Sequence, residues 1–187
     1  MKFIGIKKMD SGKYINRYNL TYETEDGETK VYEMVSRDPD IRDFETLHGV
    51  DPADAVVLIM HDEKKEKILL NKEFRMAPGL WVYNFPAGLI DPGETPEVAA
   101  ERELREETGL HLDAVEDYIP GSYSAVGFSN EKNVVIVGKA SGEFEKSTSS
   151  VEEISAAWYT KAEIRELLKN EVFSARSQMY CYLWSKE

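Results

Sequence analysis

Three glutamates near the middle of the chain have the residue type and spacing to bind a cation. Glu103, Glu106 and Glu107 are spaced i, i+3, i+4, so on a helix their carboxylates project from one face. They repel each other by about 0.2–0.5 kcal/mol per pair and lie near the C-terminal end of the expected helix, where the dipole favours cations. A bound divalent cation would reverse both effects, and oxygen-only ligands favour Mg²⁺ or Mn²⁺ over zinc. For an isolated helix, a solvated acidic face beside Arg102 and Arg105 is the more common explanation.

The ends of this helix are well marked in the sequence. Thr95 is a suitable N-cap, Pro96 suits the first helical position, and Gly109 is a typical stop, so we expect a helix over 96–108. A loop rich in glycine and proline, residues 86–93, comes directly before it. If the helix were only an acidic surface helix, the presence of this loop would have no explanation.

The elements around the helix are mostly strands. Residues 1–37 alternate as strands, and Asp26-Gly27 is a strong hairpin turn. Further strands are expected at 53–61, 67–75, 81–85, 112–119, 134–140 and 154–159, with closing helices at 161–169 and 174–185. One helix among antiparallel-looking strands predicts an α+β fold or a mixed sandwich. We expect an N-terminal β-hairpin subdomain with its connector over 1–50 and a main domain over 51–187.

Composition excludes several function classes. The chain has 187 residues with 35 acidic and 23 basic side chains, a net charge of −12, which argues against binding a nucleic-acid backbone. An anionic substrate would therefore need positive charge from a metal ion. Cys181 is the single cysteine and excludes an intramolecular disulfide. The longest apolar run, residues 55–60, is too short to span a membrane, and no targeting segment is visible. We expect a cytoplasmic protein without a membrane or nucleic-acid partner.

The loop and the helix together resemble a known motif, the Nudix box, here residues 88–110. Its fixed positions are matched by Gly88, Glu94, Arg102, Glu103, Leu104, Glu106, Glu107 and Gly109. Four further segments resemble the ADP-ribose pyrophosphatase branch of the Nudix hydrolase family: the end of the N-terminal hairpin, 32–37, and the segments 73–75, 85–91 and 127–131. The resemblance implies an α/β/α sandwich with a mixed sheet, plus a small N-terminal antiparallel β subdomain. It also implies Mg²⁺-dependent hydrolysis of the pyrophosphate bond of ADP-ribose to AMP and ribose 5-phosphate, with Mn²⁺ as a possible substitute.

The resemblance also assigns roles at the reacting end of the site. The metal ligands that it implies are the carbonyl of Ala87 and the carboxylates of Glu103, Glu106 and Glu107. The general base is expected from the segment 147–154, where Glu153 is slightly preferred over Glu152; Glu106 is also counted among the catalytic residues.

The substrate-binding residues that the resemblance implies are Arg37, Arg75, Tyr14, Tyr32 and Leu89. The arginines match positions that grip the diphosphate and the terminal ribose, and the tyrosines match rings that flank adenine. From the residues alone, surface arginines and sheet-packing tyrosines are about as good an explanation. The sequence departs from the pattern at three places near the expected pocket, one of which is 125–127, where the proline usual before Gly127 is absent. Asn84 stands where relatives often have glutamate, and Glu73 stands where glutamine is common.

These observations leave three possible functions open and predict one oligomeric state. The substrate is ADP-ribose or another nucleoside diphosphate sugar such as GDP-mannose. A non-catalytic ADP-ribose sensor would need a lost glutamate or an attached DNA-binding domain. The hairpin over 14–37 exposes aromatic and apolar residues that its few strands cannot cover. Because members of the branch that it resembles are homodimers, we expect a homodimer packed through the N-terminal strands.

Overall fold

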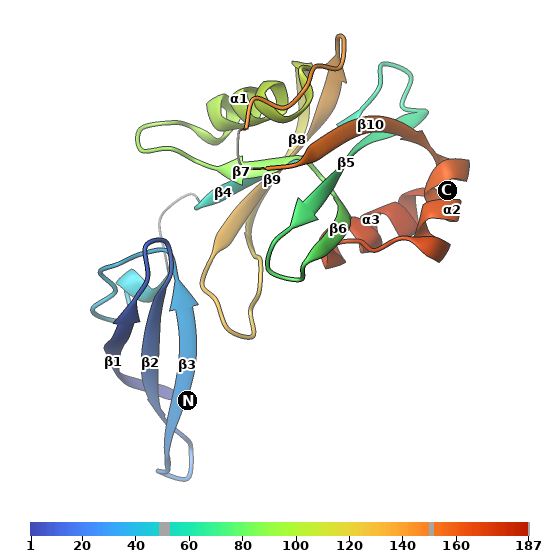
Figure 1. Cartoon of the computed structure of the whole chain (residues 1–187). Coiled ribbons are helices and arrows are strands. Elements are labelled where there is room, and N and C mark those ends of the chain that lie inside the picture. Colours follow the sequence, from blue (N-terminus) through green and yellow to red (C-terminus); the bar gives the residue numbers. More distant parts are fainter. Residues whose placement is uncertain (49–52, 150–151, 187) are drawn as a thin grey trace. The chain divides into compact units, whose positions relative to one another are not determined.

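The chain divides into two compact units in a computed structural model that describes residues 1–48, 53–149 and 152–186 (Figure 1). The N-terminal unit consists of Met1–Ala55 and Pro120–Val134, and the larger unit consists of Val56–Ile119 and Val135–Glu187. Residues 120–134 were expected in the main domain but cluster with the N-terminal strands. Part of the expected connector, 49–52, and part of the expected base segment, 150–151, lie outside the described residues.

The N-terminal unit is built on a three-stranded antiparallel sheet in the order β1 (Lys2–Ser11), β2 (Asn16–Glu23), β3 (Thr29–Ser36). The expected hairpin is present: Glu23 pairs with Thr29, and Gly27 has a φ of 79°, which glycine adopts without strain. A short 3₁₀ helix, η1 (Thr46–His48), follows. Alternate residues of β2 and β3 form one apolar face. The core of this unit is Tyr18, Leu20, Met34, Ile41 and Leu47.

The larger unit is built on a seven-stranded sheet with the path β10–β5–β4–β9–β8, in which β6 pairs with β5 and β7 pairs with β4. The strands are β4 (Ala55–His61), β5 (Lys67–Arg75), β6 (Leu80–Asn84), β7 (Ala87–Leu89), β8 (His111–Tyr123), β9 (Lys132–Ser141) and β10 (Ile154–Thr160). Residues 120–123 of β8 and 132–134 of β9 count with the N-terminal unit.

Helices cover both faces of this sheet (Figure 1). On one face α1 (Pro96–Thr108) packs Ala100 and Leu104 against Leu58 and Met60 of β4. On the other face α2 (Lys161–Asn170) and α3 (Ala175–Trp184) pack against the alternate residues of the same strands; that cluster includes Val57, Ile59, Ile68, Leu70, Ile164, Cys181 and Trp184. Since both faces are covered, every residue of β4 is buried. The predicted α/β/α sandwich with a small N-terminal sheet is confirmed.

The expected elements are present with their ends shifted by a few residues, and β5 and α1 have the predicted bounds. The sequence analysis missed β7 and η1, because three residues inside a loop show no periodicity. Within the described ranges, no helix is long and apolar enough to cross a membrane.

Candidate functional site

The ends of α1 are capped as the sequence predicts. The Thr95 hydroxyl accepts a hydrogen bond from the Val98 backbone N–H, and Pro96 is the first residue of the helix. At the other end Gly109 has a φ of 81°, and its N–H donates to the Arg105 carbonyl. These caps fix where α1 ends and therefore where its last turn presents the three glutamates.

The glutamates of α1 line a pocket of about 360 Å³ in the larger unit. Its lining residues are Glu103, Glu106, Glu107, Ser147, Thr148, Ser149 and Glu152. The segment after β9 is anchored to the C-terminal end of α1. The Thr148 N–H donates to the Glu106 carbonyl over 2.9 Å, and the Glu145 N–H donates to the Thr108 carbonyl over 3.0 Å. Two helix carbonyls that would otherwise lack partners are thereby satisfied.

The electrostatics of the pocket favour positive charge. Burial raises the pKa of Glu107 well above its usual value, and the nearby charges of Glu103 and Glu73 raise it further. Burial also raises the pKa of Glu103, opposed by Arg102 and reinforced by Glu106 and Glu152. Carboxylates from α1 and from the segment before β10 therefore lie within each other's electrostatic reach.

Arg102 supplies cationic charge to this cluster. Its Nε and Nη2 atoms donate to the two oxygens of Glu94 over 2.9 and 2.8 Å, and this pairing lowers the pKa of Glu94 to about 2. Its Nη1 donates to Glu103 over 2.6 Å and to Glu106 over 3.4 Å. Its Nη2 also donates to the Leu89 carbonyl over 2.9 Å. Arg102 thus joins the loop before α1 to the carboxylates of the helix.

The residues fit a hard divalent cation, although within the described ranges no three acidic, histidine or cysteine side chains converge tightly enough to hold one as they stand. Glu103 is drawn to Arg102 instead. A Cβ at Gly88 would lie 1.9 Å from Cδ of Glu103, so the missing side chain makes room for this carboxylate against the loop. The donor set consists of oxygen atoms, and its surplus negative charge suits Mg²⁺ or Mn²⁺.

The other residues expected at the reacting end lie at or near the pocket. Glu152 and Glu153 are both exposed, but of the two Glu152 lines the pocket. The Glu153 carbonyl accepts a hydrogen bond from the Phe74 N–H over 3.0 Å. The N–H of Ala87 donates to Oε2 of Glu107 over 3.3 Å, which places Ala87 beside the buried carboxylate. Leu89 lies in β7 with its side chain 42% exposed.

The expected substrate-binding residues divide between the two units. Arg75 of the larger unit lies 3.4 Å from Oε2 of Glu73. In the N-terminal unit, Nε of Arg37 donates to Glu131 over 2.8 Å. Tyr14 precedes β2 and is 65% exposed. Tyr32 lies in β3, and its hydroxyl donates to the Gly127 carbonyl.

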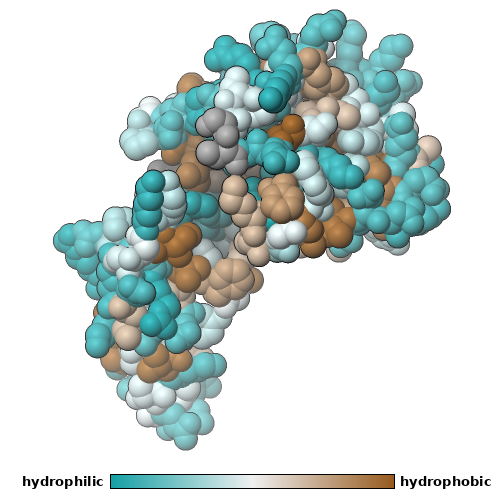
Figure 2. Space-filling view, in the orientation of Figure 1, coloured by the Kyte–Doolittle hydropathy of each residue, from teal (hydrophilic) through white to brown (hydrophobic). Residues whose placement is uncertain are grey.

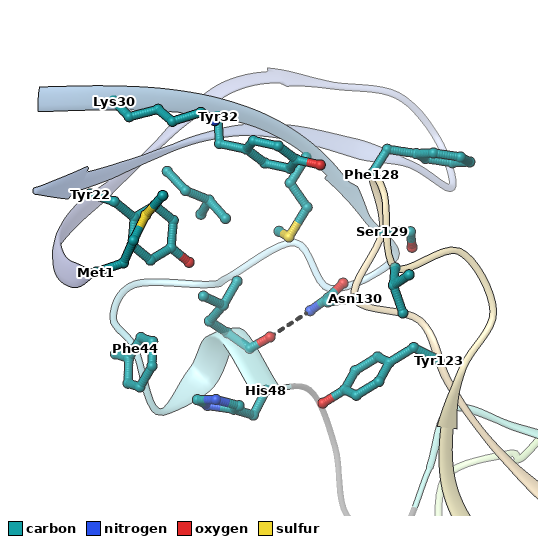
Figure 3. A pocket seen from close by; sticks show the side chains of 14 residues that line it. Met1, Tyr22, Lys30, Tyr32, Phe44, His48, Tyr123, Phe128, Ser129 and Asn130 are labelled. Carbon is teal, nitrogen blue, oxygen red and sulfur yellow. Dashed lines mark hydrogen bonds between the residues drawn. The ribbon is translucent and has the colours of Figure 1, made fainter. Parts of the chain in front are cut away.

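Tyr32 also lines a larger, mainly apolar cavity of about 460 Å³ that lies entirely within the N-terminal unit (Figure 3). Several aromatic rings face this cavity from the sheet, from the segment around η1 and from the loop 123–130, and Asn130 joins that loop to the Leu47 carbonyl over 3.0 Å. The labelled lining residues are Met1, Tyr22, Lys30, Tyr32, Phe44, His48, Tyr123, Phe128, Ser129 and Asn130. Of these, Tyr32 was expected at a binding site, and Phe128, Ser129 and Asn130 lie in the segment 127–131 that resembles the family. For Tyr22, the apolar alternation of β2 was the available signal.

A chain of buried polar side chains lies between β5, β6 and α3. Its members Asn84 and Glu73 were singled out from the sequence, but Asn71, Ser174, Ser177 and the bonds that join them were not. Asn84 donates to Glu73 over 2.9 Å and accepts from the hydroxyls of Ser174 and Ser177 over 2.7 and 2.9 Å. Asn71, in the middle of β5, donates to Glu107 over 2.8 Å. The signal in the sequence was the presence of amides and a carboxylate inside otherwise apolar strands.

Comparison with known proteins agrees with this geometry. The chain matches the NUDIX domain over residues 51–182, which include the loop, α1 and the pocket. An ADP-sugar pyrophosphatase of Mus musculus is 33% identical over 110 residues, covering 58% of this chain and 47% of that protein. An ADP-ribose pyrophosphatase of Saccharomyces cerevisiae is 30% identical over 126 residues, covering 67% and 52% respectively.

A crystal structure described as an ADP compounds hydrolase has the same fold, with a TM-score of 0.72, 17% identity and coverage of 100% of this chain and 93% of that one. The matched part spans about half the length of the curated relatives, between 42% and 52% for the first three. The family match covers most of the chain and includes the capped helix with its glutamates. The chain therefore belongs to the NUDIX domain family.

Proposed function

We propose that this protein hydrolyses the pyrophosphate bond of a nucleoside diphosphate-linked small molecule, with ADP-ribose as the first candidate and AMP and ribose 5-phosphate as products. The observation that carries the proposal is the pocket in which Glu103, Glu106 and Glu107 meet Glu152. Relatives with related activities in their names support the substrate class. Another nucleoside diphosphate sugar, such as GDP-mannose, remains the alternative substrate.

Each residue of the pocket has a role in this reaction. Glu103, Glu106, Glu107 and the Ala87 carbonyl would hold a divalent cation, Mg²⁺ in our proposal. Held there, the cation would supply a lowered pKa for the attacking water and would neutralise charge on the diphosphate. Glu152 accepts a proton from the water that attacks phosphorus, while the phosphorus–oxygen bond to the leaving phosphate breaks. We favour Glu152 over Glu153 as the base because only Glu152 lines the pocket.

Arg75 and Arg37 are proposed to bind the anionic and ribose parts of the substrate, since arginine suits bidentate contact with phosphate. Leu89 is proposed to contact the substrate beside the loop. Tyr14 and Tyr32 are proposed to stack on adenine. Aromatic faces bind bases with about 1–3 kcal/mol per ring.

The strand register argues that these two tyrosines come from different subunits. Tyr32 pairs with Leu20, four residues beyond Asn16, and Tyr14 lies before Asn16. Four residues of strand span about 13 Å, so the backbones of the two tyrosines lie well apart along one chain. We propose that Tyr14 of one subunit and Tyr32 of its partner flank the same base.

A homodimer through the N-terminal unit would bring the two tyrosines together. Hydrophobic side chains reach the surface over the N-terminal sheet (Figure 2). They include Ile4 at 50%, Ile15 at 44% and Val31 at 56% exposure. Covering them with a second copy about a two-fold axis would remove this apolar surface from water.

A substrate panel tests the proposal. ADP-ribose, GDP-mannose and other nucleoside diphosphate sugars are incubated with Mg²⁺ or Mn²⁺, and the released phosphomonoester is measured. We expect ADP-ribose to be hydrolysed best, and Glu107→Gln to fold but lose hydrolysis by at least about a hundredfold. Near-normal turnover by Glu107→Gln would refute the metal assignment. A panel without any hydrolysis would refute the activity, and a preference for GDP-mannose would establish the alternative.

A further inference from the structure

Asn71 is a buried amide inside an apolar strand. It follows Ile68, Leu69 and Leu70 in β5, each of which is fully buried, and is itself 1% exposed. Burying an amide costs free energy unless hydrogen bonds replace those made with water, so an aliphatic side chain would suit this position better for packing alone. The amide therefore needs an explanation in its contacts.

The main contact of this amide is with the buried carboxylate of α1. Nδ2 of Asn71 donates to Oε2 of Glu107 over 2.8 Å. Because the NH₂ end of the amide makes this bond, Oδ1 is turned away from Glu107. Within the described ranges Oδ1 is buried and has no hydrogen-bond partner. Because an unpaired buried acceptor is unfavourable, stability alone does not account for Asn71.

The effect on Glu107 is to engage one of its two carboxylate oxygens. The Ala87 N–H donates to the same Oε2 over 3.3 Å, so donors from β5 and β7 converge on this atom. In the part of the chain that the structure describes, Oε1 receives no hydrogen bond. A glutamate side chain has three rotatable bonds, and two donors on one oxygen restrict its orientation. The arrangement leaves Oε1 available to the pocket that Glu103 and Glu106 also line.

We propose that Asn71 is a positioning residue for Glu107, which fixes Oε2 so that Oε1 can bind a divalent cation. The proposal rests on the proposed function in one respect, that this pocket binds such a cation. It does not depend on which diphosphate is the substrate. Partners that orient metal ligands typically change metal affinity by about 10- to 100-fold when they are lost.

Mn²⁺ binding to the full chain tests this role without a substrate. Free Mn²⁺ is followed by electron paramagnetic resonance in titrations of the wild type, Asn71→Leu and a matched control, Asn133→Leu. Asn133 is also a buried strand asparagine at 4% exposure, but it donates to the Ser124 hydroxyl over 2.6 Å in the N-terminal unit. Urea unfolding of the same proteins without metal measures stability. If Asn71→Leu does not fold, Asn71→Ser, whose shorter side chain cannot reach Glu107, takes its place.

We expect Asn71→Leu to raise the Kd for Mn²⁺ by about 10- to 100-fold, whereas Asn133→Leu leaves it unchanged. An unchanged Kd in the Asn71 variant, or an equal rise in both variants, would overturn the inference. So would a wild type that binds no Mn²⁺ at millimolar concentrations. A wild type whose Mn²⁺ affinity depends on Asn71 but which hydrolyses no diphosphate would support the inference and refute the proposed function.

Discussion

At Gly88 the chain has no side chain, and the carboxylate of Glu103 occupies the space beside it. The three glutamates and Gly88 could be predicted from the sequence, because local spacing along one helix and one loop fixes them. Asn71 could not be predicted, since its contact with Glu107 depends on how β5 lies against α1. Glu73 and Asn84 were singled out from the sequence, but the bond between them depends on how β5 pairs with β6. Residue types and their spacing predict the reacting side chains, whereas the side chains that orient them come from elements distant in the sequence.

We predict that Gly88→Ala impairs cation binding more than it impairs stability. The new Cβ would lie 1.9 Å from Cδ of Glu103, the end of a flexible side chain, so the carboxylate would move aside while the backbone stays in place. Mn²⁺ affinity is expected to fall by about tenfold or more, and the free energy of unfolding in urea to change by less than about 1 kcal/mol. Gly5→Ala is the control, because a Cβ there meets nothing within 4 Å. Mn²⁺ binding by Gly88→Ala equal to that of the wild type would contradict the prediction.

His61 predicts a pH dependence of stability. It is 6% exposed at the end of β4, and its Nε2 lies 3.2 Å from the Tyr180 hydroxyl of α3. Burial lowers its pKa from 6.5, and Lys65 lowers it further. The unfolded chain therefore binds a proton that the folded chain resists, so stability is full above the unfolded pKa and falls as the pH drops through 6.5 toward the folded pKa.

Urea unfolding from about pH 8 to pH 5.5, on either side of the ordinary histidine pKa, measures this effect against His61→Gln, which cannot titrate. The difference in free energy of unfolding between wild type and variant should be constant at the alkaline end and shift against the wild type at the acid end. A difference that is flat throughout would show that His61 titrates normally.

At the scale of elements, periodicity and caps predicted most of the fold. α1 has the expected bounds because Thr95 and Gly109 are strong local signals. β4 could be recognised as a continuous apolar run, which is typical of a strand buried on both faces of a sheet. The grouping of the segment 120–134 with the N-terminal strands could not be predicted. Its attachment to the N-terminal unit depends on contacts such as Val35 N–H to the Phe128 carbonyl, 2.8 Å, which no local pattern encodes.

The C-terminal cap of α1 gives a prediction about stability. Gly109 has a φ of 81°, and a Cβ there would lie 2.5 Å from the Glu145 backbone nitrogen. Gly109→Ala should therefore both strain the cap and displace the segment anchored at Thr108, and lower the free energy of unfolding by about 2–4 kcal/mol. Gly93→Ala is the matched control, because its φ of 91° brings the same kind of strain but its Cβ meets nothing within 4 Å. Equal losses of stability in urea would mean that the Glu145 contact contributes nothing.

At the scale of the whole molecule, a small unit with exposed apolar residues accompanies a unit that carries the acidic pocket. The sequence supported this division in outline, since the N-terminal strands are too few to cover their own hydrophobic side chains. It could not show that the smaller unit is completed by a later segment. Nor could it show the spacing of Tyr14 and Tyr32, which follows from the register of β2 and β3.

Subunit mixing tests whether the adenine site is shared. Tyr14→Ala and Tyr32→Ala are each expected to raise the KM for ADP-ribose strongly, since each removes one stacking ring. If one site takes Tyr14 from one subunit and Tyr32 from its partner, a mixed dimer has one intact site. Unfolding and refolding the two variants together should then restore about a quarter of the wild-type sites, because about half of the dimers are mixed. No recovery in a mixture that sedimentation shows to be dimeric would place both rings in one subunit.

The discontinuous N-terminal unit has a consequence for biosynthesis. Residues 120–134 complete it, in part through two hydrogen bonds. Asn130 donates to the Leu47 carbonyl, and the Gly127 carbonyl accepts from the Tyr32 hydroxyl. When β1, β2 and β3 have emerged from the ribosome, this segment has not yet been translated. The apolar face of the sheet therefore stays exposed while about a hundred further residues are added. The first unit to emerge is thus complete only once residue 134 has been translated, and until then its sheet can associate with other chains.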